Sequence, residues 1–437
     1  MQSAGLRSWQ DRAVVAVALA SLMAGVGEFG AVAALGDVSR AFGSHNPGTT
    51  IADQAGLSGT SLGAGLAVIR LASVGGLLVA GLADRFGRRR TILLTVTAGL
   101  VLTAATATSP GYWWFVAVFA AGRPFLSATN SVSAVSAAEH TGSDSRSKAL
   151  ALVAAGYGIG AGLTAIVHGL AGSQLGFRGV FAFAALPLVL LPLIRRWAKE
   201  PDRFALAAAA HPAELPVIAA VSGPFRRRLA VVAVIAFALS MITGPGTGFV
   251  FLYAQNVRHV PGYLTASMVV AAGASGLAGL LAGRWMADRL GRRVTSAVGM
   301  CGLAGLGLVT YAGSGWTLVA GYVLGVGAGS MIAPATGPLI TEVFPTPIRA
   351  SVMGWWTAAG VVGAAAGLLL FGAVADAGGM FWAAAAATFL PATLAVPLFW
   401  LLPEPVGREP EDLCPEPIRA EPFASNRSTV REYRVDP

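Results

Sequence analysis

Charged side chains are scarce in this sequence. Only 12% of its 437 residues are Asp, Glu, Lys or Arg, whereas 55% are hydrophobic and the mean hydropathy is +0.67. A soluble domain is usually about a quarter charged and under half apolar. The chain therefore has too little polar surface to cover a water-soluble globule of this length.

Clustered metal ligands and catalytic motifs are missing as well. The two cysteines, Cys301 and Cys414, lie far apart, and the five histidines are scattered without a pair at helical spacing. No disulfide framework or metal site can be built from such spacings. A phosphate-binding loop of the G-x-x-x-x-G-K-[ST] type is also absent. We therefore expect neither an enzyme nor an ATP-driven pump, and no cofactor or metal.

Long apolar runs make up most of the chain instead. A membrane helix needs about 20 mostly apolar residues, and the first run here is too long for the core of a signal peptide. Twelve runs predict an all-α membrane protein with twelve transmembrane helices in a lipid bilayer. They cover 13–36, 57–80, 91–109, 111–137, 148–171, 177–196, 229–254, 263–286, 294–313, 315–340, 350–375 and 379–402.

Basic residues are distributed unevenly between the loops. If the amino terminus is cytoplasmic, the inner loops carry clusters such as 226–228 and 289–293, whereas the outer loops carry only Arg40, Arg178 and Arg258. Cytoplasmic loops are enriched in Lys and Arg. We therefore expect a protein of the inner membrane with both termini in the cytoplasm. The net charge of +9 follows from this asymmetry, so no nucleic-acid partner is expected.

Two loop sequences occur twice at nearly the same offset. A-D-R-F-G-R-R at 83–89 recurs as A-D-R-L-G-R-R at 287–293, which is 204 residues later. The loop 139–146 recurs at 342–349 after 203 residues, and each copy has Glu seven residues before Arg. Matched signatures at one spacing indicate an internal duplication.

The duplication divides the chain into two six-helix halves. The largest gap between the apolar runs contains three prolines and a basic cluster, and the end of the chain is polar and rich in proline. Such a polar tail is expected to be disordered. The predicted parts are the first half at 1–196, a central cytoplasmic loop at 197–228, the second half at 229–402 and a cytoplasmic tail at 403–437.

The repeated loops resemble those of a known family. A-D-R-x-G-R-R is similar to the signature that the major facilitator superfamily carries between helices 2 and 3 and again between helices 8 and 9. The segment E-V-F-P-T-P-I-R-A at 342–350, Gly122-Arg123 and Glu200-Pro201 resemble motifs of its sugar porters and of its organic-acid and aromatic-acid proton symporters. The resemblance implies a monomeric secondary transporter that moves a small-molecule substrate by alternating access.

These loops are expected to gate the conformational change. A carboxylate at the end of one helix can pair with arginines or face the positive end of a neighbouring helix, and glycine permits the tight reversal. The alternative is that the charges only set the topology. The gating residues predicted on this basis are Asp84, Arg85, Gly87, Arg88, Arg89, Asp288, Arg289, Gly291, Arg292 and Arg293, together with Glu139, Arg146, Glu342 and Arg349.

Three charged residues fall inside apolar runs. Ionisable groups are costly in hydrocarbon and usually face a cavity or a partner. Glu28 lies in the first run, and Arg70 and Arg123 lie near the middle of the second and fourth. One interpretation is a structural Glu–Arg pair that locks the first half. The other is that Glu28 carries a proton while an arginine holds an anionic group, as the resemblance to proton-coupled sugar porters implies for Glu28 and Arg123.

Other polar or aromatic residues within the runs could line a substrate pocket. Asn130, Tyr157 and Trp355 are the further candidates. Aromatic residues in membrane helices more often serve in packing or in interfacial belts. These three are therefore predicted site residues with an ordinary packing alternative.

The function predicted from these features is proton-coupled uptake of a small organic anion, an aromatic acid or a sugar-like metabolite. Proton-antiport efflux of drugs or metabolites is the first alternative. A substrate sensor built on a transporter fold is the second. One sequence does not identify the solute, because fold and function are only loosely linked.

The predicted orientation can be tested by cysteine labelling. In a background without Cys301 and Cys414, a cysteine at Ser44 should react with an impermeant maleimide added outside intact cells, and a cysteine at Ser428 should react only after permeabilisation. The reason is the excess of arginine on the proposed inner side. The reverse labelling pattern would contradict the orientation.

Overall fold

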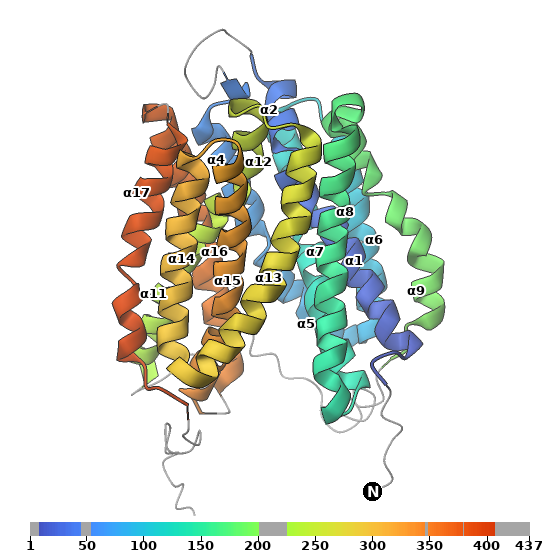
Figure 1. Ribbon diagram of the computed structural model, residues 1–437. Coiled ribbons are helices and arrows are strands. Elements are labelled where there is room, and N and C mark those ends of the chain that lie inside the picture. The colour runs from blue at the N-terminus through green and yellow to red at the C-terminus, as the bar shows by residue number, and fades with distance from the viewer. Residues whose placement is uncertain (1–7, 45–53, 201–224, 346–347, 379, 407–437) are drawn as a thin grey trace, which may run out of the picture.

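The computed structural model describes residues 8–44, 54–200, 225–345, 348–378 and 380–406. Most of the predicted central loop and tail, including Ser428, lies outside this range. The described chain is helical and contains no β-strand. Figure 1 shows the helices as two groups that stand side by side.

Each group is built from long apolar helices with short connections. The first group contains α1 (Arg12–Ala33), α2 (Leu35–Phe42), α4 (Gly59–Ala72), α5 (Gly75–Phe86), α6 (Arg88–Ala105), α7 (Tyr112–His140), α8 (Ser143–Phe183) and α9 (Leu191–Trp197). The second contains α11 (Arg226–Gly248), α12 (Val250–Leu252), the π-helix η4 (Tyr253–Val257), α13 (Gly262–Leu290), α14 (Arg292–Ala312), α15 (Trp316–Glu342), α16 (Arg349–Gly378) and α17 (Phe381–Thr393).

The predicted all-α fold with twelve membrane helices is confirmed. Eleven helical segments in the described chain are long and apolar enough to cross a membrane. The twelfth is α7, which has 29 residues and packs between α6, α1, α5 and α4. Arg123, Asn130 and several serines and threonines interrupt its apolar sequence.

Several spans are interrupted in ways that the apolar runs did not predict. The second span is divided between α4 and α5 at Ser73 and Val74. The sixth span begins within α8, where Gly176 has a positive φ of 58° and kinks the helix. Glycine tolerates this backbone conformation because it has no Cβ.

The two groups meet at the end of the bundle that carries α2, which we call the α2 end. The opposite end carries the loops at Gly87 and Gly291, and we call it the motif end. Hydrogen bonds between the groups lie at the α2 end, where the Asn256 side chain donates to the carbonyl oxygen of Gly36 at 3.1 Å. In Figure 1, α13 leans away from α8 towards the motif end. The groups are thus held together at the α2 end.

Close backbone contact fixes the packing of α1 against α8. Gly156 and Gly160 of α8 lie against the carbonyl oxygens of Ala18 and Leu22, and a Cβ at either position would clash with them. Small residues at this spacing let membrane helices approach closely. Gly156 and Gly160 therefore allow α8 to pack directly against the backbone of α1. Gly158, by contrast, has open space where its Cβ would be.

Replacing one of these glycines tests the packing. Gly160→Ala should lower the free energy of unfolding by about 1–3 kcal/mol, because a Cβ there overpacks the α1–α8 contact. Gly158→Ala is the matched control, since it adds the same methyl group to the same helix without a clash. Thermal unfolding in detergent measures both. Equal melting temperatures for the two variants would contradict the packing argument.

Candidate functional site

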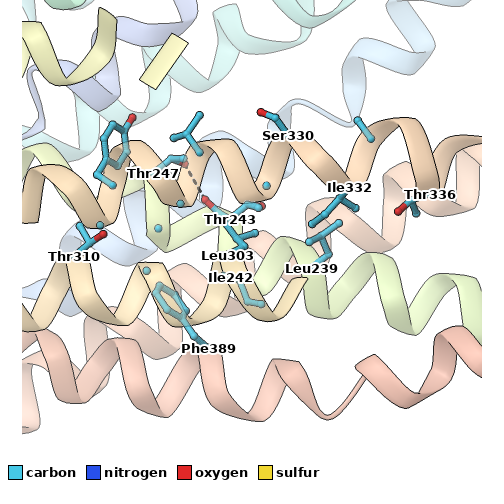
Figure 2. A pocket seen from close by; sticks show the side chains of 18 of the residues that line it. Leu239, Ile242, Thr243, Thr247, Leu303, Thr310, Ser330, Ile332, Thr336 and Phe389 are labelled. Carbon is cyan, nitrogen blue, oxygen red and sulfur yellow. Dashed lines mark hydrogen bonds between the residues drawn. The ribbon is translucent and has the colours of Figure 1, made fainter. Parts of the chain in front are cut away.

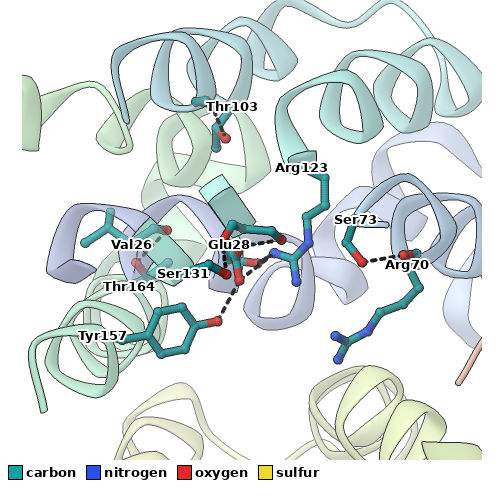
Figure 3. Close-up of polar contacts among 11 residues, drawn as sticks. Val26, Glu28, Arg70, Ser73, Thr103, Arg123, Ser131, Tyr157 and Thr164 are labelled. Atoms are coloured by element: carbon teal, nitrogen blue, oxygen red, sulfur yellow. Dashed lines mark hydrogen bonds and ion pairs between the residues drawn. The ribbon is translucent and has the colours of Figure 1, made fainter. Parts of the chain in front are cut away.

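A buried ion pair lies in the middle of the first group of helices. The Glu28 carboxylate in α1 is 3.1 Å from a guanidinium nitrogen of Arg123 in α7, and each residue is only 8% exposed. The Tyr157 hydroxyl of α8 donates to the same carboxylate at 2.7 Å (Figure 3). The Ser127 hydroxyl of α7 also donates to this carboxylate, at 3.2 Å. Three predicted site residues, Glu28, Arg123 and Tyr157, are thus brought together.

The chain reaches this arrangement through a close helix crossing. Gly25, one turn before Glu28, lies against the backbone carbonyl of Tyr157, where a Cβ could not fit. The small residue lets α8 approach α1. The Tyr157 side chain can therefore reach the Glu28 carboxylate on the neighbouring turn.

Arg70 of α4 lies beside this pair but does not join it. Within the described residues, its guanidinium has no hydrogen-bond or ion-pair partner, and Figure 3 shows only its carbonyl oxygen accepting a bond from Ser73. Arg70, Glu28 and Arg123 line a cavity of about 40 Å³ whose remaining wall includes Thr247 of α11. The Arg70 guanidinium thus lies at the boundary between the two groups.

A second and larger cavity lies within the other group of helices. It has a volume of about 500 Å³ and is mostly apolar, with Thr243, Thr310 and Ser330 among its polar lining residues (Figure 2). Tyr322 also lines it. Charged residues are absent from its described lining. Thr247 lines both this cavity and the smaller one, so the two are adjacent.

Two predicted site residues lie away from the charged cluster. Asn130 accepts a 2.7 Å hydrogen bond from Ser21, which links α7 to α1. Trp355 is 39% exposed and does not line either cavity, whereas its neighbour Trp356 lines the larger one. The sequence placed an aromatic residue at this point of α16 but did not indicate which of the two faces inwards.

The loop between α5 and α6 is a tight reversal held by a carboxylate from the segment that follows α9. Gly87 has a φ of 92°, a backbone conformation that favours glycine. The backbone N–H groups of Arg88 and Arg89 both donate to the carboxylate of Glu200, which follows α9. The Arg88 side chain forms a two-pronged ion pair with Glu139 at the end of α7, at 3.0 and 3.2 Å.

The loop between α13 and α14 repeats this arrangement. Gly291 has a φ of 94°, and the N–H groups of Arg292 and Arg293 donate to the carboxylate of Glu404. The Arg292 side chain is paired with Glu342 at the end of α15. A carboxylate at the start of a helix satisfies free N–H groups and matches the positive end of the helix dipole.

The other predicted gating residues make fewer polar contacts in the described structure. Arg85, Arg146 and Asp288 are exposed, and Arg289 lies over the Trp285 ring at 4.7 Å. Arg349 donates to the carbonyl oxygen of Phe344 at 3.0 Å. The Asp84 side chain lies outside what the structure describes.

Glu404 is a site residue that the sequence interpretation missed. It lies in the segment assigned to the tail, and Glu200 was noted only as part of a resemblance. A signal was present, however, because Glu200-Pro201 and Glu404-Pro405 are a third repeated pair at the offset of 204 residues. The carboxylates could have been assigned as helix caps from that repeat.

Comparison with known proteins agrees with this geometry. The sequence model of the Major Facilitator Superfamily matches residues 17–336 and 275–431. The chain belongs to the major facilitator superfamily. The family and the matched relatives are transporters rather than enzymes, in agreement with the expectation from the sequence.

Curated relatives match over part of their length. The 3-(3-hydroxy-phenyl)propionate transporter of Escherichia coli K12 is 37% identical over 142 residues, which is 30% of this chain and 32% of the relative. A putative metabolite transport protein of Haemophilus influenzae is 28% identical over 130 residues, with the same coverage. The chain thus aligns with about a third of the length of each.

A solved structure supports the fold over nearly the whole chain. The xylose transporter XylE from E. coli, in an inward-open conformation, matches with a TM-score of 0.70 and 18% identity, covering 92% of this chain and 98% of that one. At this identity the likeness shows the fold alone. The predicted major facilitator fold is confirmed.

Removal of one partner tests the buried pair. Arg123→Ala should lower the free energy of unfolding by about 3–5 kcal/mol, because it leaves the Glu28 carboxylate uncompensated in a buried site. The double variant Glu28→Gln/Arg123→Gln removes both charges and should recover most of that loss. Unfolding in detergent measures the three proteins. If the single and double variants are equally destabilised, the ion pair does not account for the loss.

Proposed function

We propose that the protein is a proton-coupled secondary transporter that takes up a small organic anion by alternating access. The observation that carries the proposal is the buried Glu28–Arg123 pair with Arg70 beside it, whose guanidinium has no hydrogen-bond or ion-pair partner in the described part of the chain. Ionisable groups inside a membrane bundle are costly and mark solute or proton pathways. A substrate pocket between two helix repeats is also the usual plan of such transporters.

Glu28 is proposed as the proton-carrying group. While its carboxylate is ionised, it pairs with Arg123 and accepts bonds from Tyr157 and Ser127. A proton on Glu28 would remove the charge that Arg123 neutralises. The freed guanidinium could then take part in binding an anion or in moving α7 relative to α1, so that protonation and solute binding become coupled.

Arg70 and the larger cavity are proposed as the two parts of the solute site. An arginine can bind a carboxylate through two parallel N–H bonds. The adjacent cavity of about 500 Å³ is large enough for a small ring and offers hydroxyl groups but no charge. This division suits a molecule with one anionic end and a neutral body.

The substrate class follows from this division together with the relatives. An aromatic acid is supported by the E. coli relative, a 3-(3-hydroxy-phenyl)propionate transporter, and a sugar-like metabolite by the hydroxyl groups that line the cavity. We propose the organic anion first, because Arg70 has no other partner within the described residues. Efflux by proton antiport and substrate sensing are the alternatives.

The membrane arrangement is part of the proposal. We place the protein in the inner membrane as a monomer, with the motif end and both termini in the cytoplasm. In that orientation the α2 end is closed to the outside in this conformation. Asp84 and Asp288 are proposed to engage the opposing group of helices when the motif end closes, which accords with the exposure of Asp288 here.

Transport by purified protein tests the proposal directly. Proteoliposomes should accumulate a labelled aromatic or aliphatic carboxylate from a panel when a pH gradient, acidic outside, is imposed, and should accumulate far less without the gradient. If the proteoliposomes take up a neutral sugar but no carboxylate, the substrate is a sugar and the proposed organic anion is wrong. Export driven by the gradient would favour the antiport alternative.

The Glu28→Gln variant separates binding from coupling. We expect it to retain counterflow exchange but to equalise the inside and outside concentrations instead of accumulating solute, because the proton site is lost while Arg70 remains. Ser127→Ala, which removes one hydrogen bond to Glu28 but keeps the carboxylate, is the control and should still accumulate solute. If Glu28→Gln concentrates solute with the normal pH dependence, the pair is a structural lock.

A further inference from the structure

A carboxylate of the second group of helices caps a helix of the first group. Asp376, in the last turn of α16, accepts hydrogen bonds from the backbone N–H groups of Gly59 and Thr60 at 2.6 and 2.8 Å. It also accepts a bond from the Thr60 hydroxyl at 2.6 Å. These are the first two residues of α4, and they lie more than 300 positions away in the sequence.

The capping of α4 is divided between the residue that precedes it, Ser58, and Asp376 of α16. The side chain of the local cap residue, Ser58, accepts from the N–H group of Ser61 at 3.1 Å, and no bond from it to the N–H groups of Gly59 or Thr60 is found in the described residues. The first N–H groups of a helix have no partner within the helix. Two of the free N–H groups of α4 are therefore satisfied only while α16 is in place.

The location of Asp376 in its own helix supports a role across the interface. A negative charge in the last turn of a helix is unfavourable, because the helix dipole is negative there. The same charge is favourable at the start of another helix, where the dipole is positive. Asp376 is the third-last residue of α16, and its charge is favourably placed only with respect to α4.

The backbones of α4 and α16 lie in direct contact beside this cap, which fixes the position of Asp376 relative to the start of α4. Gly59 packs against the backbone of Gly372, and Gly63 packs against the carbonyl of Leu368. These contacts place the first turn of α4 within reach of a short carboxylate. The cap and the glycine contacts thus form one seam at the α2 end.

The pseudo-symmetric seam between α8 and α13 lacks such a cap. There Gly169 packs against Gly262, the first residue of α13. His168 at this seam bonds to Asp37 of its own group at 2.7 Å and approaches Gln255 of the other group at 3.5 Å. Among the described residues, no carboxylate caps the first turn of α13. In the described residues, a carboxylate that caps a helix of the opposite group is therefore found at the α4–α16 contact and not at the α8–α13 contact.

We propose that Asp376 is a conformational latch that holds the α2 end closed and that must release the start of α4 when this end opens. The inference rests on the proposed alternating access. Release exchanges three protein hydrogen bonds for bonds to water, so the net stabilisation is modest and reversible. A modest stabilisation suits a gate, because it favours the closed state at the α2 end and still allows that end to open. Asp376 is thus a positioning residue and does not touch the solute.

Distance measurement between spin labels tests the latch without any solute. Labels on cysteines at Ala41 and Ser314, both exposed at the α2 end and on opposite groups, report closure in a background where Cys301 and Cys414 are serine. Asp376→Asn should raise the ratio of long to short distances by roughly tenfold, the effect of losing about one charge-assisted hydrogen bond.

Three further variants make the test specific. Thr60→Val removes only the hydroxyl bond and should give a smaller shift in the same direction. Asp376→Glu keeps the carboxylate and should stay nearer to the parent. Ala377→Asn places a new amide on the adjacent exposed residue and should leave the distances unchanged. If Asp376→Asn does not fold, the shift in Thr60→Val decides the question.

The outcomes distinguish the latch from the transport proposal. An unchanged distance distribution in Asp376→Asn, or an equal shift in Ala377→Asn, would overturn the latch. A shift in Asp376→Asn in a protein that moves none of the labelled solutes would support the latch and contradict uptake.

Discussion

The cost of placing charge inside a membrane shapes the first group of helices. The Glu28–Arg123 pair has both members almost fully buried, and each depends on the other for its electrostatic compensation. The surrounding packing stabilises that pair. Because Gly25 lets α8 approach α1 closely, the Tyr157 hydroxyl is near enough to donate to the Glu28 carboxylate. Arg70 lies outside this compensated set, and for that reason the proposed solute site is centred on it.

The helix ends show a second use of charge. Glu200 and Glu404 cap α6 and α14 within their own groups, whereas Asp376 caps α4 from the opposite group. The intragroup caps can persist through any movement of one group against the other. The intergroup cap cannot, because its donors and its acceptor lie on different bodies. A carboxylate that caps a helix therefore stabilises the fold of one group at Glu200 and Glu404. At Asp376 it stabilises the conformation in which the two groups meet at the α2 end.

Much of this could be predicted from the sequence, for physical reasons. Twelve apolar runs gave the spans because a bilayer imposes their length, and the repeated Gly87 and Gly291 gave the two tight reversals. Buried charge was also visible, since Glu28 and Arg123 interrupt otherwise apolar runs. Contacts that join distant helices were not visible. Asp376 lies just beyond an apolar run and resembles any loop residue until the start of α4 is placed beside it, and Trp355 and Trp356 differ only in the direction each faces.

Thr247 lines both cavities and lies between a charged compartment and a neutral one. Each compartment is contributed mainly by a different half of a duplicated chain. After such a duplication, mutations could reshape the neutral compartment without disturbing the costly charges of the other half. If the proposed function holds, a lineage of such proteins can change the neutral part of its solute while it keeps the proposed anion-binding and proton-binding residues.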